Sequence, residues 1–281
     1  MNQKNNDYKF NYRHVALYPA PVRLGIFILT LGLIWLPVAA PIYLILSSNP
    51  NLVTILTMGL LLAAFLLLLR FWSRRVYQQA HLLKRYGLEA NWRNGRDLFN
   101  GLSVGLSFVL ALFALEGILG WLEFQPPTSS LLRVVVEGLV SALGVGLAEE
   151  LLFRGWLLDE LQHDYAPETA LWANAIIFAL LHFLKPLAEV VRTLPELPGL
   201  ILLGLTLVWA RHSRQGRLAM AVGLHAGLVW GYYIVNVGQL VQYGEHISPW
   251  VTGVDGNPLA GVMGLVFLGV LALGMRKRSL V

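Results

Sequence analysis

The sequence has no cysteine and little charge. Because all 281 residues lack cysteine, disulfides, thiolate nucleophiles and metal sites with cysteine ligands are excluded. Asp, Glu, Lys and Arg together make up only 13% of the chain, well below the roughly 25% of an average soluble protein. Hydrophobic residues make up 56% and the mean hydropathy is +0.61. So few charges cannot cover the surface of a soluble domain, and the composition predicts a protein whose solvent is mostly lipid.

Long apolar runs predict where the chain crosses the membrane. A crossing helix needs about 20 predominantly apolar residues. The runs that meet or approach this length are 23–46, 52–72, 98–122, 131–158, 169–184, 198–210, 218–235 and 259–275. The expected fold class is therefore an all-α, polytopic membrane helix bundle of about eight transmembrane helices.

The basic residues predict the orientation of this integral, multi-pass protein. With the N-terminus in the cytoplasm, 18 of the 21 Lys and Arg residues fall in cytoplasmic segments, and only Arg133, Lys185 and Arg192 fall outside. Cytoplasmic loops carry such an excess of Lys and Arg. We expect both termini to be cytoplasmic.

The same runs suggest three parts. We expect residues 1–22 to form a cytoplasmic N-terminal segment, 23–97 a two-helix membrane unit with a basic interfacial segment, and 98–281 a six-helix membrane domain. The basic stretch 73–97 has interleaved apolar residues, as expected for a helix on the membrane surface. Because the basic residues lie between apolar runs, we expect anionic lipids at the cytoplasmic face as partners, and no nucleic acid.

A few ionisable residues lie inside the apolar runs of the second half of the chain. Each costs roughly 2.5–3.5 kcal/mol on insertion scales, so such residues are candidates for function. The candidates are Glu149, Glu150, Arg154, His182 and His225.

The two adjacent glutamates are expected to differ in role. Neighbours on an α-helix point about 100° apart, so Glu149 and Glu150 are not expected to share a direction. Glu150 and Arg154 stand at i, i+4 in the order that favours an ion pair. Glu149 is then the unpaired carboxylate and the candidate general base. The alternative is that these charges mark a cytoplasmic helix end.

Together these residues resemble a known family. Glu149-Glu150-x-x-x-Arg154, then Phe178-x-x-x-His182, then His225 on a later helix resemble the motifs of the CAAX-protease and bacteriocin-processing family of intramembrane endopeptidases. The likeness covers about 131–235. It implies that Glu149 activates a water and that Glu150 and Arg154 support the site. It also implies that Phe178 packs beside the site, and that His182 and His225 bind the water or a zinc ion.

One position departs from the family pattern. The family usually has Asn or Asp four residues after the second histidine, and Val229 stands there. A zinc site usually has at least three protein ligands, and the histidines supply two. If zinc is the cofactor, Glu149 is therefore expected in or next to its ligand shell with His182 and His225. The alternative is a metal-free reaction in which Glu149 is the base.

The expected activity is endoproteolysis of a membrane-tethered protein or peptide. A catalytically degenerate scaffold or immunity protein is a second hypothesis, because of Val229. A proton-coupled transporter using the same Glu and His residues is a third, although no internal repeat is visible. Gly101-Leu-Ser103-Val-Gly105 matches the serine nucleophile pattern, but that motif needs a strand before the serine, and here it opens an apolar helix.

Overall fold

The structure, a computed structural model, describes residues 12–127 and 130–280. Of the expected N-terminal segment 1–22, residues 1–11 lie outside the described part. The chain is 79% helical with almost no strand, which confirms the all-α class. It divides into two compact units, Met1–Leu82 and Leu83–Val281.

The first unit is a helical hairpin. It contains the 3-10 helix η1 (Tyr12–Leu17) and the long helices α1 (Ala20–Ile45) and α2 (Pro50–Arg75). Trp35 on α1 donates its indole N–H to the carbonyl oxygen of Thr57 on α2 at 2.9 Å. The ring of Phe27 packs edge-on against Phe65 and Trp72. Aromatic packing and one indole hydrogen bond therefore join the two helices.

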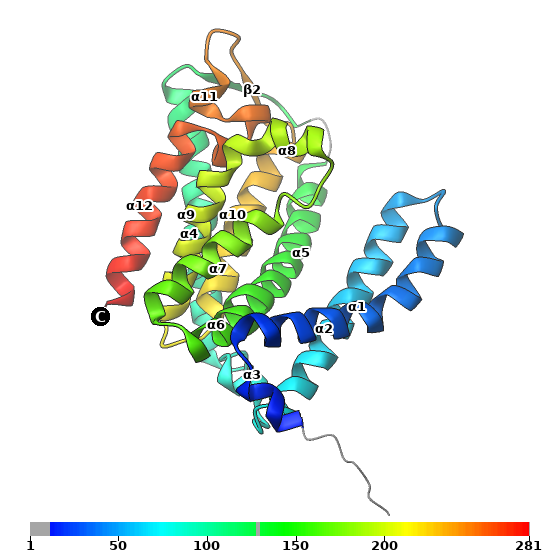
Figure 1. Cartoon of the computed structure of the whole chain (residues 1–281). Coiled ribbons are helices and arrows are strands. Elements are labelled where there is room, and N and C mark those ends of the chain that lie inside the picture. Colours follow the sequence, from blue (N-terminus) through cyan, green and yellow to red (C-terminus); the bar gives the residue numbers. More distant parts are fainter. Residues whose placement is uncertain (1–11, 128–129, 281) are drawn as a thin grey trace, which may run out of the picture. The chain divides into compact units, whose positions relative to one another are not determined.

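The second unit holds the helices that carry the candidate site (Figure 1). Its long helices are α4 (Trp92–Ile118), α5 (Leu131–Glu149), α7 (Pro167–Leu181), α9 (Leu197–His212), α10 (Ala219–Val237) and α12 (Val262–Ser279). Its shorter helices are η2 (Glu150–Leu157), α6 (Leu158–Asp164), α8 (Leu187–Thr193), η3 (Leu194–Glu196), α11 (Pro249–Thr252), η4 (Val254–Gly256) and η5 (Pro258–Ala260). Helix α3 (Leu82–Arg85) begins at the boundary between the units. Strands β1 (Leu122–Phe124) and β2 (Val241–Tyr243) pair antiparallel.

Helix α10 is central to this bundle because it packs against α4, α5 and α9, while α9 also packs against α7 and α12. Glycines permit the closest approach. A Cβ atom at Gly101 would meet the backbone of α10 at Met220 and Leu224, and one at Gly105 would meet it at Leu224 and Leu228. The glycines around Ser103 therefore allow close helix packing. They do not form a serine nucleophile motif, because no strand precedes Ser103 in the described chain.

The basic stretch 73–97 does not form one surface helix, so that expectation was wrong. Helix α2 ends at Arg75, α3 has four residues, and α4 begins at Trp92. Residues 83–97 belong to the second unit, whereas the sequence places that boundary after residue 97. Long-range contacts explain the difference. The carbonyl of Tyr86 accepts a hydrogen bond from the amide of Leu218 at 2.9 Å, and Asp97 pairs with Arg217.

Six helical stretches of the described part are long and apolar enough to cross a membrane: Ala20–Ile45, Pro50–Arg75, Trp92–Ile118, Leu131–Asp164, Leu187–His212 and Ala219–Val237. The multi-pass helical bundle is thus confirmed. The other two expected spans are also helices. Helix α7 has 15 residues, and the 18-residue α12 has three basic residues in its last turn. A count of eight spans stays a prediction.

Candidate active site

The helix that carries both glutamates changes its geometry where they stand. Helix α5 ends at Glu149, the π-helix η2 runs from Glu150 to Leu157, and α6 continues to Asp164. The sequence predicts a single regular helix here. π-helical turns inside α-helices are rare and occur often at functional sites, so the change of geometry itself marks this segment.

Glu150 binds two other residues of the candidate site, Arg154 and His225. Its side chain is fully buried, and its Oε1 atom accepts hydrogen bonds from Arg154 Nη1 at 2.8 Å and from His225 Nδ1 at 2.9 Å. The predicted ion pair between Glu150 and Arg154 is confirmed. A carboxylate paired in this way is an acceptor only, so it fixes the proton of His225 on Nδ1 and leaves Nε2 for other partners.

Glu149 lies at the opposite ring nitrogen of the same imidazole. Its Oε2 atom is 3.8 Å from Nε2 of His225 and, although buried, has no hydrogen-bond partner among the described residues. The side chain as a whole is 30% exposed. The two glutamates thus differ in their surroundings, since Glu150 is fully buried at Nδ1 and Glu149 is partly exposed at Nε2. Both reach His225, because an imidazole presents its nitrogens on different edges of the ring and the helix changes to π geometry at Glu150.

Phe178 joins the two histidines to the buried arginine. The ring, fully buried on α7, lies 4.5 Å from the ring of His182 and 6.3 Å from that of His225, measured between centroids. The guanidinium of Arg154 lies 4.3 Å from the same ring, within the range of a cation–π interaction. Phe178 thus holds three of the predicted site residues in place.

His182 caps the end of α7. Its Nδ1 atom lies 2.7 Å from the carbonyl oxygen of Phe178. A carbonyl only accepts, so Nδ1 carries the proton and Nε2 keeps its lone pair. His182 and His225 therefore have the same tautomer, each with Nε2 free of a hydrogen bond within the described part of the protein.

Two residues that the sequence analysis did not single out hold the π-helix. Asn174 on α7, fully buried, donates from Nδ2 to the carbonyl oxygen of Phe153 at 2.7 Å. Arg211 on α9 donates from Nη1 to the carbonyl oxygen of Arg154, and from Nη2 to Asp159 at 2.9 Å. Side chains from two other helices thus bind consecutive carbonyls of η2.

A signal for Asn174 was present in the sequence, because it is a polar residue inside an apolar helix, four residues before Phe178. Arg211 was counted only among the cytoplasmic basic residues. Its contact with the π-helix depends on the packing of α9, which the spacing of residues does not reveal.

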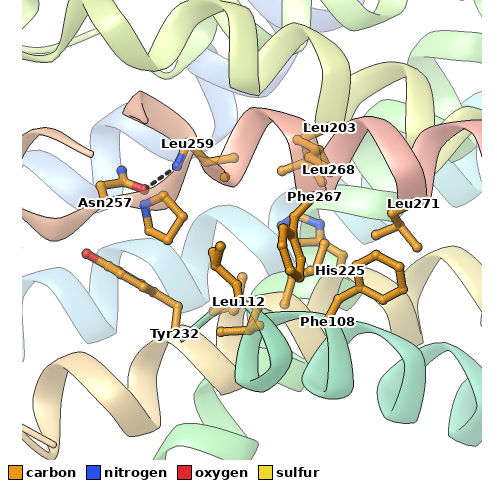
Figure 2. Close-up of a pocket in the computed structure, with 15 residues that line it drawn as sticks. Phe108, Leu112, Leu203, His225, Tyr232, Asn257, Leu259, Phe267, Leu268 and Leu271 are labelled. Atoms are coloured by element: carbon orange, nitrogen blue, oxygen red, sulfur yellow. Dashed lines mark hydrogen bonds between the residues drawn. The ribbon is translucent and has the colours of Figure 1, made fainter. Parts of the chain in front are cut away.

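An apolar cavity of about 210 Å³ borders His225 (Figure 2). Its walls come from α4, α9, α10, α12 and the segment 257–259, and include Phe108, Leu112 and Phe267. Val229, the position that departs from the family pattern, also lines it. The walls offer few polar groups, so the cavity suits an apolar group rather than water.

The residues do not converge as a metal site. Within residues 12–127 and 130–280, no three His, Asp or Glu side chains are grouped closely enough to hold a metal ion. The donors that the chain offers are Nε2 of His182, Nε2 of His225 and Oε2 of Glu149. Zinc is therefore still an untested prediction, and this arrangement does not fit it without movement.

Comparison with known proteins agrees with the motifs. Residues 131–231 match the model of a family described as Rce1-like, "Type II CAAX prenyl endopeptidase Rce1-like". This range contains all six motif residues and confirms the resemblance seen in the sequence. The match extends from α5 into α10 and so includes the segments that carry both glutamates and both histidines. No curated protein and no solved structure was found to match the chain.

Proposed function

We propose that the protein is an intramembrane endopeptidase that cleaves membrane-tethered peptides or proteins with a water activated by Glu149. One observation carries the proposal. The Oε2 atom of Glu149 has no hydrogen-bond partner within the described residues and faces Nε2 of His225, whose other nitrogen is held by Glu150. A carboxylate free to accept a proton beside an oriented imidazole suits general-base catalysis.

The proton moves in a closed cycle. Oε2 of Glu149 takes a proton from the water as its oxygen attacks the scissile carbonyl carbon. Nε2 of His225, with its lone pair, accepts a hydrogen bond from the same water and so positions it for attack. The tetrahedral intermediate that forms carries negative charge on the former carbonyl oxygen. Glu149 then gives its proton to the departing amine as the C–N bond breaks, so the carboxylate is restored.

The other residues position this pair. Glu150 binds Nδ1 of His225 and Arg154 neutralises Glu150, so the imidazole stays oriented without an uncompensated buried charge. Phe178 and the apolar walls around His225 keep the surroundings poor in water. Electrostatic interactions are stronger in such surroundings.

Zinc assistance remains a further hypothesis within this proposal. The ligands would be His182, His225 and Glu149, which the described structure does not bring together as a metal site. The activation of water and the proton transfers are therefore assigned to side chains of the protein.

The test is cleavage of a membrane-tethered peptide library by purified protein in liposomes, with Glu149→Gln as the inactive control. We expect the wild type to release fragments and the variant to release none. A folded wild-type protein that cleaves nothing in the library would contradict the proposal. That result would favour the alternative of a degenerate scaffold or immunity protein, which is motivated by the apolar Val229 beside His225.

A further inference from the structure

Away from the glutamate and histidine site, two arginines pair with one buried carboxylate, and two more arginines stand on the helix that carries it. Asp97, 1% exposed, pairs with Arg214 at 3.2 Å and with Arg217 at 2.5 Å. Arg93 joins the same loop through the side chain of Gln215 at 3.2 Å. Arg96 stands on the same helix, one residue before Asp97. We call these five residues the Asp97 cluster.

Positive charge is in excess in this cluster. Arg93 and Arg96 are exposed, and neither makes an ion pair within the described residues. Glu89 is the acidic residue of the turn before α4. Among the described residues, it makes no ion pair with any of the four arginines. The pKa of Arg217 is lowered by burial, and the charges of Arg93, Arg214 and Arg96 act in the same direction against the opposite effect of Asp97. The cluster therefore has four positive charges and one negative charge, and this excess of positive charge favours an added anion.

Arg217 of the cluster packs closely against the backbone of a turn. The side-chain stem of Arg217 lies against Gly87, where a Cβ atom would collide with it, and Gly87 has a positive φ of +61°. The neighbouring Tyr86 carbonyl accepts from the amide of Leu218 at 2.9 Å, which fixes the turn to the start of α10. Arg217 is therefore held in place before any ligand arrives.

The cluster also lies at the end of a membrane helix. Helix α4 begins at Trp92 and is one of the candidate spans. Trp92 and Phe99 are 83% and 67% exposed, beside Arg93 and Arg96 on the first two turns. Tryptophan is enriched at the interface between lipid and water, and the N-terminal end of a helix favours negative charge. Aromatic and basic side chains thus share one exposed helix end.

We propose that the Asp97 cluster binds the phosphate of an anionic phospholipid, with Arg93 and Arg96 contacting the phosphate and Trp92 and Phe99 lying among the acyl chains. Guanidinium groups bind phosphate with two parallel hydrogen bonds, and the aromatic residues select a phosphate attached to lipid over one in water. This binding site is separate from the proposed catalytic residues and does not depend on their activity.

The experiment measures how much phosphatidylglycerol the full-length protein retains in nanodiscs that contain phosphatidylcholine and a small fraction of phosphatidylglycerol. The variant Arg93→Gln/Arg96→Gln removes the two exposed arginines and leaves the pairs of Asp97 intact. The matched control, Arg276→Gln/Arg278→Gln, removes two arginines from the last turn of α12. We expect roughly tenfold or greater loss of retained lipid in the first variant, and little change in the control.

Three results would overturn the proposal. The first is equal retention by the wild type and by a folded Arg93→Gln/Arg96→Gln protein. The second is an equal loss in the control pair, which would indicate general surface charge instead of a site. The third is displacement of the lipid by inorganic phosphate at the same concentration as the lipid phosphate, which would make the ligand a free anion. Retention that withstands inorganic phosphate and is lost in the first variant supports a lipid site.

Discussion

His225 and Glu150 form a buried hydrogen bond of 2.9 Å between Nδ1 and Oε1. The same oxygen accepts from Arg154, and the side chain of Glu150 is fully buried, so Glu150 holds two partners and has no exposed surface at which to meet water. The bond also turns Nε2 of His225 toward Glu149. The roles of two adjacent glutamates therefore follow from which ring nitrogen each one faces.

Glu149→Gln is expected to abolish cleavage without unfolding the protein. Gln keeps the shape but cannot take a proton, and the side chain it replaces makes no hydrogen bond through Oε2 in the described structure. Glu150→Gln should instead lower the free energy of unfolding, by up to about 3–5 kcal/mol, because Arg154 keeps a buried charge without its counter-charge. Rates of peptide release and thermal unfolding of both variants measure this difference.

Glu137→Gln is the matched control, since Glu137 is half exposed and pairs with Arg133 on the same helix. We expect nearly wild-type behaviour from it. If Glu150→Gln is the folded but inactive variant while Glu149→Gln cleaves, the two roles are reversed.

Asn174→Ala is expected to lower kcat more than it changes KM. The substitution removes the hydrogen bond to the Phe153 carbonyl in η2, so the π-helix loses a support next to the glutamates. Loss of one buried hydrogen bond costs about 1–3 kcal/mol. Asn174→Asp should do more harm, because it replaces the donor by a second acceptor against the carbonyl.

A control for general destabilisation is Thr193→Ala, which removes a buried hydroxyl that donates to the carbonyl oxygen of Glu189 on its own helix. Asn174→Ala and Thr193→Ala should lower the melting temperature comparably, yet only the first should lower kcat. Equal kcat losses would show that Asn174 acts through stability alone.

Val229→Asn is expected to increase turnover at some loss of stability. The asparagine restores an oxygen and an N–H donor one turn after His225, where an oxyanion donor helps most. It also places a polar amide on the wall of an apolar cavity, at a cost of about 1–3 kcal/mol. Val229→Leu is the control of similar burial without polar atoms. Turnover that falls equally in both variants would mean that position 229 only fills space.

The sequence predicted the features that depend on neighbours in the chain. Apolar runs located the helices, because lipid requires each span to be apolar along its own length. The pair of Glu150 and Arg154 followed from a spacing of four. The change to a π-helix at Glu150 was not predicted, since no local pattern distinguishes it and its carbonyls bond to side chains from α7 and α9.

The parts of the site that were missed depend on packing. Asn174 reaches Phe153 across 21 residues of sequence, and Arg211 reaches Arg154 across 57. The same holds for residues 83–97, which join the second unit through Tyr86 and Asp97. The motif match to the family located Glu149, His182 and His225 but gave no geometry. The distances between them depend on how α5, α7 and α10 pack.

The distribution of basic residues predicts the orientation. Because the chain lacks cysteine, single cysteines introduced at the exposed positions Ser48, Glu245 and His81 can be labelled with maleimide without a background from native thiols. An impermeant maleimide added to sealed cells should label the first two, which lie between α1 and α2 and between β2 and α11, and should spare the third. Labelling at His81 in intact cells would contradict cytoplasmic termini.

The zinc hypothesis from the sequence predicts that cleavage depends on a bound metal ion. If Glu149, His182 and His225 move together around zinc, a chelator should abolish cleavage, added zinc should restore it, and His182→Ala or His225→Ala should lose both metal and activity. A site with only two histidines should bind zinc more weakly than one with three. The measurements are elemental analysis of the purified protein and cleavage rates after chelation.

The geometry favours the opposite result, because no three such ligands converge in the described residues. Activity that survives exhaustive chelation, with no zinc in the protein, yet disappears in Glu149→Gln would eliminate zinc. Catalysis would then rest on the carboxylate and imidazole alone. In that case His225→Gln, which can still donate to Glu150 but has no nitrogen lone pair at the position of Nε2, should lose most activity while His225→Ala loses stability as well. A wild-type level of cleavage by His225→Gln would remove the imidazole from the mechanism.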